Sequence, residues 1–191
     1  MNRREIKEQL KQKLKPGRYE HTLGVEYTSA CLAMRYGYPM EKADIAGLLH
    51  DCAKCLSDEE KLLMCRERKI PISEAEEKNP GLLHAKLGAS LAKELYGIEE
   101  EEILSAICCH TTGKPAMTLL EKIVFIADYI EPNREHAPSL EKLRELAFQD
   151  LDRCLILILE QTLDYLNKTG ADIDPMTEET YQYYKRQEVT V

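Results

Sequence analysis

Hydrophobic residues recur at helical spacing along most of the chain. Ile6, Leu10 and Leu14 form one apolar stripe, and Pro16-Gly17 follows directly. Because a spacing of three or four residues brings side chains to one face of an α-helix, a first helix is predicted here. Alternating apolar and polar positions, the pattern of a strand, never extend beyond four residues. The sequence therefore predicts an all-α protein.

A second helix is predicted from near Arg18 to Tyr36, where Gly37 ends it, and a third from Pro39 to about Asp51. The apolar residues of the second helix predict which of its side chains point inward. We expect this inward face to carry Leu23, Tyr27, Ala30, Cys31 and Met34.

Local start and stop signals divide the rest of the chain into further helices. Capping boxes at 57–60 and 73–76 open two of them, the first reaching Arg68 and the second short. Asn79-Pro80-Gly81 interrupts the chain, and a helix then runs to Tyr96. The segment 118–130 is apolar on most sides, which predicts a central helix. The other predicted helices span 99–110, 139–167 (one long helix or two abutting ones) and 174–186.

Length and composition favour one globular domain over residues 1–191. The chain is 43% hydrophobic, enough for a sizeable core, and no apolar run reaches transmembrane length. A net charge of −8 argues against a nucleic-acid-binding face. No secretory signal follows Met1, and seven cysteines, an odd count, predict free buried thiols in a reducing cytoplasm.

Histidines and aspartates stand where apolar stretches end. His50-Asp51 directly follows the run 45–49, and Asp128 follows 124–127. A buried carboxylate needs a positive partner, and a divalent metal with neutral histidine ligands would supply one. Taken singly, each histidine is more often a core or capping residue, and Asp128 could equally pair with backbone amides or an arginine. Three more histidines lie at helix ends, namely His21, His84 and His110; His136 lies in a polar loop and is expected at the surface.

The order of these residues resembles the HD-domain superfamily of metal-dependent phosphohydrolases, over about residues 18–134. The stretches 50–54, 80–85, 110–117 and 122–134 narrow this resemblance to the bacterial YqeK family, with helices at 139–187 completing the fold and the nucleotide pocket. The resemblance implies an HD-domain helical bundle that cleaves diadenosine tetraphosphate symmetrically into two ADP through a metal-activated water. It also implies iron, a cytoplasmic location and a homodimer, with a dinucleoside polyphosphate or a nucleoside diphosphate as the ligand and no membrane partner.

By the same resemblance, His21, His50, Asp51 and Asp128 bind the first metal ion. Their nitrogen and oxygen donors suit iron, manganese, cobalt or zinc, and spacing does not choose among them. His84 and His110 could complete a second metal site or donate hydrogen bonds to a phosphate, and we slightly favour the phosphate role. The catalytic residues are expected to be Asp51, Lys54, His84 and His110.

The nucleotide and its phosphates are expected to contact residues around this centre. Lys54 follows His50 by four residues and would share its face if the helix continued that far. Arg18 and Arg134 could bind phosphate, although surface positions are as plausible. The expected set is Arg18, His21, Lys54, His84, His110, Thr111, Asp128, Arg134, Gly170, Ile173 and Pro175.

Two further motifs have less specific interpretations. Cys52 and Cys55 form a single CxxC pair, which without a second pair is weak support for a zinc or redox site. Tyr181, Tyr183 and Tyr184 could stack on a base but are more typical of packing within the domain.

Other functions share the same centre. The substrate could instead be a guanosine alarmone, a deoxynucleotide or a cyclic dinucleotide. A sensor that binds a nucleotide without turnover is the non-enzymatic alternative, and the presence of all six histidine and aspartate positions argues against it.

Overall fold

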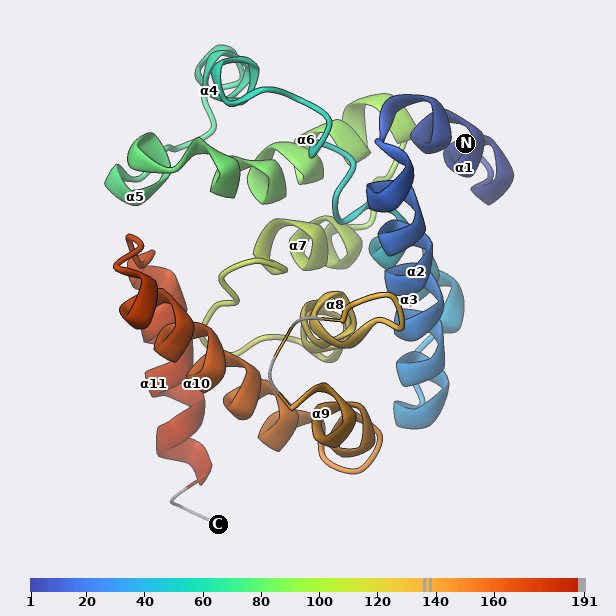
Figure 1. The fold of residues 1–191 in the computed structure, drawn as a ribbon. Coiled ribbons are helices and arrows are strands. Elements are labelled where there is room, and N and C mark those ends of the chain that lie inside the picture. Colours follow the sequence, from blue (N-terminus) through green and yellow to red (C-terminus); the bar gives the residue numbers. More distant parts are fainter. Residues whose placement is uncertain (136, 138, 189–191) are drawn as a thin grey trace.

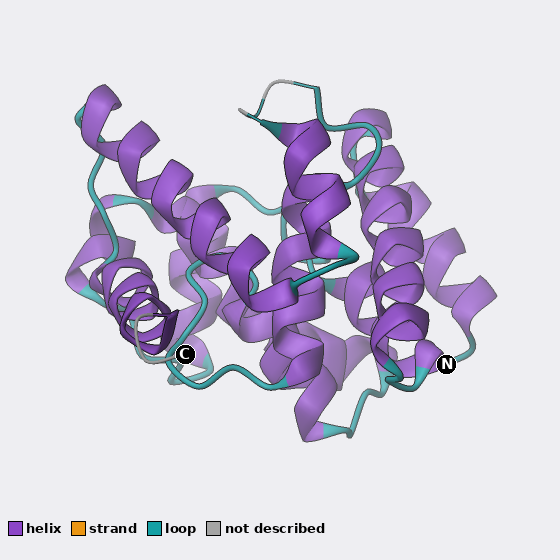
Figure 2. Cartoon of the chain, turned by 90° about the horizontal axis from the view of Figure 1, so that it is seen from below, coloured by secondary structure: helices purple, strands orange, loops and turns teal. Residues whose placement is uncertain are grey.

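The computed structural model describes residues 1–135, 137 and 139–188, and within these ranges all regular structure is helical (Figure 2). The surface residue predicted at position 136 lies outside them. The helices are α1 (Arg3–Lys13), α2 (Pro16–Tyr36), α3 (Met40–Leu49), α4 (Asp58–Glu67), α5 (Glu74–Lys78), the 3₁₀ turn η1 (Pro80–Leu83), α6 (His84–Tyr96), α7 (Glu101–Cys109), α8 (Leu119–Ile130), α9 (Leu140–Ala147), α10 (Leu151–Thr169) and α11 (Pro175–Glu188). The all-α prediction is confirmed.

Helix α8 is central, as its apolar sequence predicts. It packs against α2, α3, α7, α9 and α10, and Figure 1 shows it nearly end-on in the middle of the molecule. Ile123, Val124, Ile126 and Ala127 are fully buried there. The surrounding helices therefore all present one end or face to α8, and residues near its carboxyl end can meet residues from several elements.

Local capping signals fix most helix ends. The side chains of Ser57 and Ser73 accept hydrogen bonds from the amides of Glu60 and Glu76, so both predicted capping boxes are present. Helix α2 begins at Pro16, earlier than predicted, because proline is favoured in a first turn. The segment 139–167 forms two helices, α9 and α10, rather than one.

The predicted inward face of α2 is wrong. Tyr27 and Met34 are 54% and 62% exposed, Cys31 is exposed and Leu23 is only partly buried, whereas Ala30 is buried as expected. The buried face instead includes small and polar residues, because α3 approaches closely. A Cβ atom on Gly47 would lie 2.8 Å from the hydroxyl of Ser29. Close approach of the two helices holds the residues that follow α3 next to α2.

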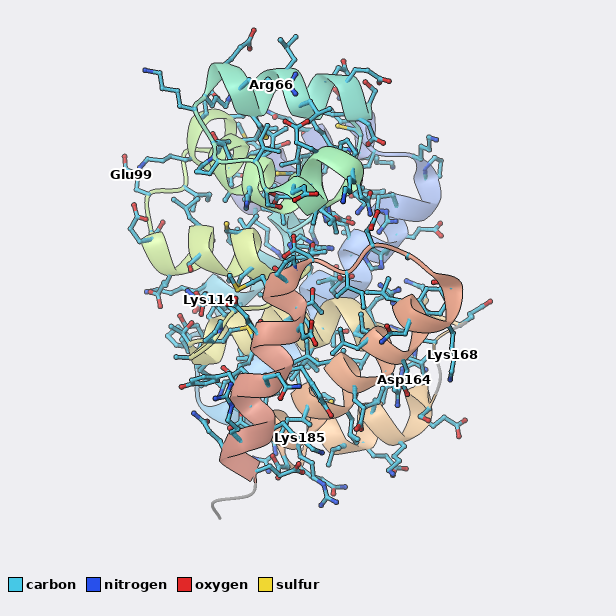
Figure 3. The ribbon with its side chains drawn as sticks, turned by 90° about the vertical axis from the view of Figure 1, so that its left-hand side faces the viewer. Arg66, Glu99, Lys114, Asp164, Lys168 and Lys185 are labelled. Carbon is cyan, nitrogen blue, oxygen red and sulfur yellow. The ribbon has the colours of Figure 1, made fainter. Side chains whose placement is uncertain are left out.

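Charged side chains cover the outer faces of the peripheral helices. Figure 3 shows them on Arg66 of α4 and on Asp164 and Lys168 of α10, all exposed. Among the described residues, no helix is both long and apolar enough to cross a bilayer.

Candidate metal centre

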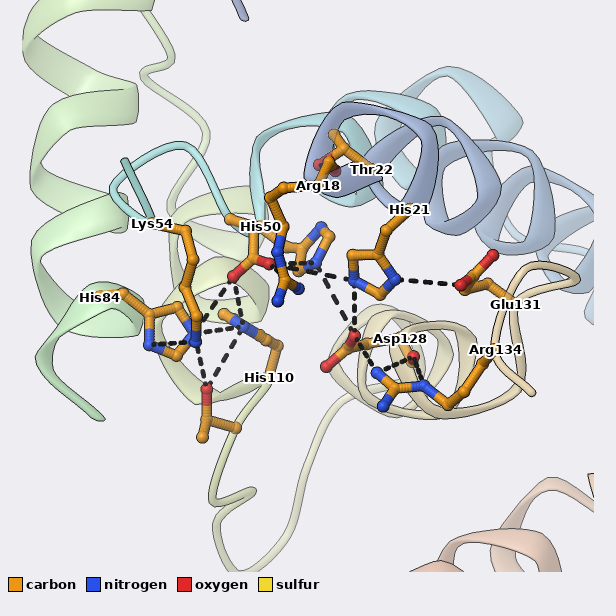
Figure 4. A network of polar contacts seen from close by, with 12 residues as sticks. Arg18, His21, Thr22, His50, Lys54, His84, His110, Asp128, Glu131 and Arg134 are labelled. Atoms are coloured by element: carbon orange, nitrogen blue, oxygen red, sulfur yellow. Dashed lines mark hydrogen bonds and ion pairs between the residues drawn. The ribbon is translucent and has the colours of Figure 1, made fainter. Parts of the chain in front are cut away.

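Six side chains from five helices and their ends converge beside the carboxyl end of α8 (Figure 4). His21 comes from α2 and Asp128 from α8, while His84 is the first residue of α6. His50 and His110 follow the last residues of α3 and α7, and Asp51 follows His50. Positions that the sequence separates by up to about a hundred residues thus meet in one cluster. The imidazoles form an edge-to-face series with ring centres 4.9–5.4 Å apart.

Three of these imidazoles are held in the same way. The Nδ1 atoms of His50, His84 and His110 donate to the carbonyl oxygens of Gly47, Gly81 and Ile107, respectively, at 2.6–2.7 Å, each to the residue three positions earlier. A carbonyl can only accept, so Nδ1 carries the proton in each ring. The neutral ring then presents a lone pair on Nε2, which is the form that binds a metal. These carbonyls lie near helix ends, where backbone oxygens lack a partner within the helix, so they are free to accept from the imidazoles.

His21 is oriented by a carboxylate instead. Its Nδ1 lies 3.1 Å from Oε1 of Glu131, and the other oxygen of that carboxylate accepts from the backbone amide of Asn133 at 2.7 Å. Gly24 makes room for Glu131, since a Cβ there would lie 2.2 Å from its Oε2. A carboxylate that accepts from a ligating histidine is a common second partner at metal sites.

One donor set surrounds a space between α2, α3 and α8. Nε2 of His21 lies 3.0 Å from Oδ1 of Asp128, and Nε2 of His50 lies 3.8 Å from the same oxygen. Oδ2 of Asp51 is 3.5 Å from Nε2 of His50 and 3.9 Å from Nε2 of His21. Ligand atoms of His21, His50 and Asp51 all lie within 4.8 Å of one another, a separation that one ion could bridge.

A second donor set shares Asp51 but uses its other oxygen. Oδ1 of Asp51 is 3.2 Å from Nε2 of His84 and 3.7 Å from Nε2 of His110. The two imidazole Nε2 atoms are 3.1 Å apart, and the hydroxyl of Thr111 lies 3.2 Å from both. Asp51 is thus positioned between two groups of nitrogen donors, and it could bridge two ions.

The donor set fits a divalent cation. Nε2 of His50 is buried without a hydrogen-bond partner among the described residues. Lone pairs of the ring nitrogens face carboxylate oxygens, an arrangement that repels unless a positive charge lies between them. These ring nitrogens therefore lack a positive partner, and a metal ion would supply one. This agrees with the divalent metal site expected from the sequence.

The pKa values follow from burial and close charges. Burial acts to raise the pKa of Asp128, but the close imidazoles of His21 and His50 outweigh it, so the pKa lies well below its usual value. Burial also opposes ionisation of His21, yet Asp128 and Glu131 hold the pKa of His21 above its usual value. Burial lowers the pKa of His84 to about 4, so His84 is neutral near pH 7.

Three cationic side chains border the cluster. Arg18 donates to Oδ2 of Asp51 at 2.8 Å, and Arg134 donates to the carboxylate and carbonyl of Asp128 at 2.8–3.1 Å. Lys54 lies in a turn beyond the end of α3, so that helix does not continue far enough to place Lys54 on the same helical face as His50. Its Nζ nevertheless lies 3.2 Å from both ring nitrogens of His84.

The predicted nucleotide contacts in the connection between α10 and α11 lie further out. Gly170 ends α10 in the left-handed conformation (φ 68°), and Ile173 is half-buried in the same connection. Pro175 lines a cavity of about 250 Å³ together with Thr111. The structure therefore brings one of these three residues to the same cavity as a residue of the cluster.

The cysteine and tyrosine motifs have structural contacts. All seven cysteines are free as predicted, but Cys31, Cys55 and Cys108 are exposed rather than buried. Cys52 and Cys55 donate to the carbonyl oxygens of Gly88 and Cys52, and burial raises the pKa of Cys52 to about 12. Tyr184 is buried and accepts from the amide of Met117, and Tyr181 donates to Glu160. These tyrosines pack within their own chain.

Glu131 is the residue of this site that sequence reasoning missed. It is almost fully buried, although it follows the last residue of α8. Its spacing offered a signal, because three residues after Asp128 is one helical turn, on the same face.

Comparison with known proteins agrees with the geometry. The HD domain family model matches residues 18–133. A protein of Bacillus subtilis (strain 168) named symmetrical bis(5'-nucleosyl)-tetraphosphatase is 42% identical over 96% of this chain and 97% of its own length. A protein of Staphylococcus aureus (strain NCTC 8325 / PS 47) with the same name is 33% identical over 96% of this chain and 95% of its own length.

A solved structure shows the same fold over nearly the whole chain. It is a Clostridium acetobutylicum protein described as a predicted HD superfamily hydrolase involved in NAD metabolism, with 39% identity, a TM-score of 0.95 and 98% of each chain covered. The resemblance expected from the sequence motifs is thereby confirmed. With its helical fold, its cluster of histidines and aspartates and its match over residues 18–133, the chain belongs to the HD domain family, in the group of the symmetrical bis(5'-nucleosyl)-tetraphosphatases.

Proposed function

We propose that this protein hydrolyses dinucleoside tetraphosphates symmetrically and converts diadenosine tetraphosphate into two molecules of ADP. The observation that carries the proposal is the near-complete coverage of relatives bearing that name, at 33–42% identity. The buried cluster of histidines and aspartates supports it chemically, because phosphate-ester hydrolysis at such clusters depends on a cation.

His21, His50, Asp51 and Asp128 would hold the first metal ion, which we propose to be iron. Two imidazoles and two carboxylates form a borderline donor set that also suits manganese, cobalt or zinc. When bound, such an ion polarises a phosphoryl oxygen and lowers the pKa of a coordinated water. Glu131 and the carbonyl of Gly47 would keep the imidazoles of His21 and His50 in the ligating tautomer.

We propose that His84 and His110 hold a second ion together with Asp51, in preference to the phosphate role that the sequence slightly favoured. Both imidazoles donate through Nδ1 to carbonyl oxygens, so each neutral ring offers a lone pair on Nε2. A lone pair cannot donate to a phosphate oxygen. It binds a cation, and Oδ1 of Asp51 faces the same space.

The cationic side chains would bind and orient the polyphosphate. Arg18 and Arg134 border the first donor set, and Lys54 borders the second, so the three could contact successive phosphates. Charge grows on the departing ADP as the bond breaks, and Lys54 would stabilise it by donating a hydrogen bond. Thr111 would donate to a phosphoryl oxygen, while Gly170, Ile173 and Pro175 would contact the nucleoside.

The test is to incubate protein purified without oxygen with diadenosine tetraphosphate and separate the products by chromatography. Iron, manganese, cobalt and zinc are each added to chelator-treated samples. We expect ADP as the sole nucleotide product and no turnover after chelation. Formation of ATP and AMP would contradict symmetrical cleavage.

The alternative functions are separated by two further measurements. A panel containing a guanosine alarmone, a deoxynucleoside triphosphate and a cyclic dinucleotide, each at equal concentration, tests the substrate class. Tight nucleotide binding without product under any metal would favour a sensor instead.

We also propose a cytoplasmic homodimer that uses the outer face of α2. Tyr27, Cys31 and Met34 lie about one turn apart and are exposed, an apolar stripe suited to a second copy of the same chain. Analytical ultracentrifugation should give a dimer for the unchanged protein and a larger monomer fraction for Met34→Glu. A monomer at all concentrations would contradict this assembly.

A further inference from the structure

A large cavity opens beside the metal centre, on the side of Arg18 and His21. Its volume is about 740 Å³, within the range of about 300–1,000 Å³ that is typical of small-molecule sites. Side chains of the metal centre and its neighbours form one side. The opposite side comes from the end of α8 and the second half of α10. We call this opposite side the α10 wall, consisting of Tyr129, Gln161, Thr162 and Tyr165.

The α10 wall has the chemistry of a nucleoside site. Tyr165 is 63% exposed, an aromatic ring on a cavity wall with its faces available for stacking. The guanidinium carbon of Arg134 lies 5.8 Å from the ring centre of Tyr129. Aromatic rings and arginine planes both stack on bases. Gln161 offers an amide and Thr162 a hydroxyl, groups that pair with base edges and ribose hydroxyls. Gln161 is already within 3.5 Å of the hydroxyl of Tyr129.

A second, smaller cavity lies beside Thr111, whose hydroxyl contacts two imidazoles of the centre. It has a volume of about 250 Å³ and is lined by Thr111, Thr112 and Pro175 among others. Thr111 contacts His84 and His110, whereas Arg18 contacts Asp51 on the side of the first donor set. The large cavity therefore borders the first donor set through His21 and Arg18, whereas the small cavity approaches the second donor set through Thr111.

We infer that the large cavity binds one of the two nucleosides of the dinucleotide through the α10 wall, while the polyphosphate crosses the metal centre toward the small cavity. This inference rests on the proposed function. A dinucleoside tetraphosphate carries a nucleoside at each end, so two cavities flanking the phosphate site match its form. Holding both ends also fixes which phosphate bond lies at the centre. The α10 wall is therefore a determinant of preference for dinucleotides over mononucleotides.

The first test compares Tyr165→Ala with the matched control Phe148→Ala. Both residues are exposed aromatics, and Phe148 follows α9, outside the cavity. Base stacking on an aromatic side chain contributes enough that we expect the KM for diadenosine tetraphosphate to rise about ten-fold in Tyr165→Ala. The kcat/KM ratio of diadenosine tetraphosphate to adenosine tetraphosphate should fall by a similar factor. Phe148→Ala should change neither value.

The second test measures binding without turnover. The chain contains no tryptophan, so Tyr165→Trp introduces a single fluorescent reporter at the cavity. Adding diadenosine tetraphosphate to chelator-treated Tyr165→Trp should change its fluorescence, because a base stacks on the indole. The matched variant Phe148→Trp should show no change.

The outcomes distinguish this inference from the proposed function. Absence of hydrolysis in the unchanged protein, with every metal tested, would overturn the proposed function. Normal hydrolysis with an unchanged KM in Tyr165→Ala, or an equal loss for both substrates, would overturn the role of the α10 wall alone. A silent Tyr165→Trp reporter at saturating dinucleotide would also overturn it.

Discussion

Single side chains decide how the imidazoles of this centre point. Three of them donate to carbonyl oxygens one turn earlier, at the end of a helix or at its first residue, and the fourth donates to Glu131. Each contact to a carbonyl oxygen spans only three residues of sequence, so the local sequence is enough to position the imidazoles of His50, His84 and His110. The role of Glu131 depends on His21, 110 residues away, so its spacing from Asp128 indicates a shared helix face but not which histidine it orients.

Glu131→Gln should weaken metal binding without unfolding the protein. Glutamine keeps the size of the side chain but removes the charge that orients His21 and raises its basicity. Loss of such a second partner typically lowers metal affinity by about 10- to 100-fold. Metal titration followed by elemental analysis measures this, with exposed Glu145→Gln as the matched control. Equal metal content in both variants would show that Glu131 does not orient His21.

Gly24→Ala should disturb the same contact from the other side. The new Cβ would lie 2.2 Å from Oε2 of Glu131, so the carboxylate must move away from His21. Overpacking of this kind costs about 1–3 kcal/mol of unfolding free energy. Gly17→Ala is the matched control, since a Cβ there meets nothing within 4 Å and alanine favours helix. Chemical denaturation of both variants gives the comparison, and equal stability would contradict the steric argument.

At the scale of helices, the sequence predicts where a helix begins and ends more accurately than which of its faces is buried. Ser57 and Ser73 are read correctly because a capping box is local. The buried face of α2 is predicted wrongly because apolar residues lie on opposite sides of this helix. The side that is buried also carries Glu26 and Ser29, which are fully buried against neighbouring helices. Only the tertiary partners α1 and α3 explain why these polar residues point inward.

Charged residues of α1, α2 and α3 form an ionic contact, and this contact predicts how the stability of the protein depends on pH. Nε of Arg3 lies 2.6 Å from both Glu26 and Asp44, and Lys7 pairs with Glu26 at 2.8 Å. Burial and the charge of Glu26 raise the pKa of Asp44 from 3.8 to about 6. Between these values the folded protein holds a proton that the unfolded chain has released. The contribution of Asp44 to stability therefore falls as the pH rises through this window.

Asp44→Asn should remove this dependence, because asparagine does not ionise. The unfolding free energy of Asp44→Asn relative to the unchanged protein should increase between pH 4 and pH 7. Urea denaturation at several pH values measures it, with exposed Asp164→Asn as the control that should track the unchanged protein. A constant difference across the range would mean that Asp44 titrates normally in the folded state.

At the scale of the whole molecule, one buried apolar cluster extends from Ile6 in α1 to Tyr184 in α11. We therefore propose that the described residues form one domain, as the length of the chain predicts. The convergence of distant histidines and aspartates on α8 could be expected only through resemblance to a family, because spacing alone does not determine which helix ends meet. The resemblance also implies that the C-terminal helices complete a nucleotide pocket, but it names none of the residues of the α10 wall, because Tyr129 and Tyr165 line one cavity only through the packing of α8 and α10.

Because the proposed ligands come from α2, α8 and the ends of α3, α6 and α7, a bound ion should stabilise the whole fold. A ligand at about one hundred times its Kd adds about 2.7 kcal/mol, which corresponds to a rise in Tm of about 5–10 °C for a chain of this size. Thermal melts of chelator-treated protein, with and without added manganese, measure the shift. Asp128→Asn should lose most of it, whereas Cys55→Ser, a substitution in the CxxC pair, should keep it. A Tm that does not respond to any divalent metal would contradict an ion held jointly by these helices, and loss of the shift in Cys55→Ser would assign the metal to the thiols instead.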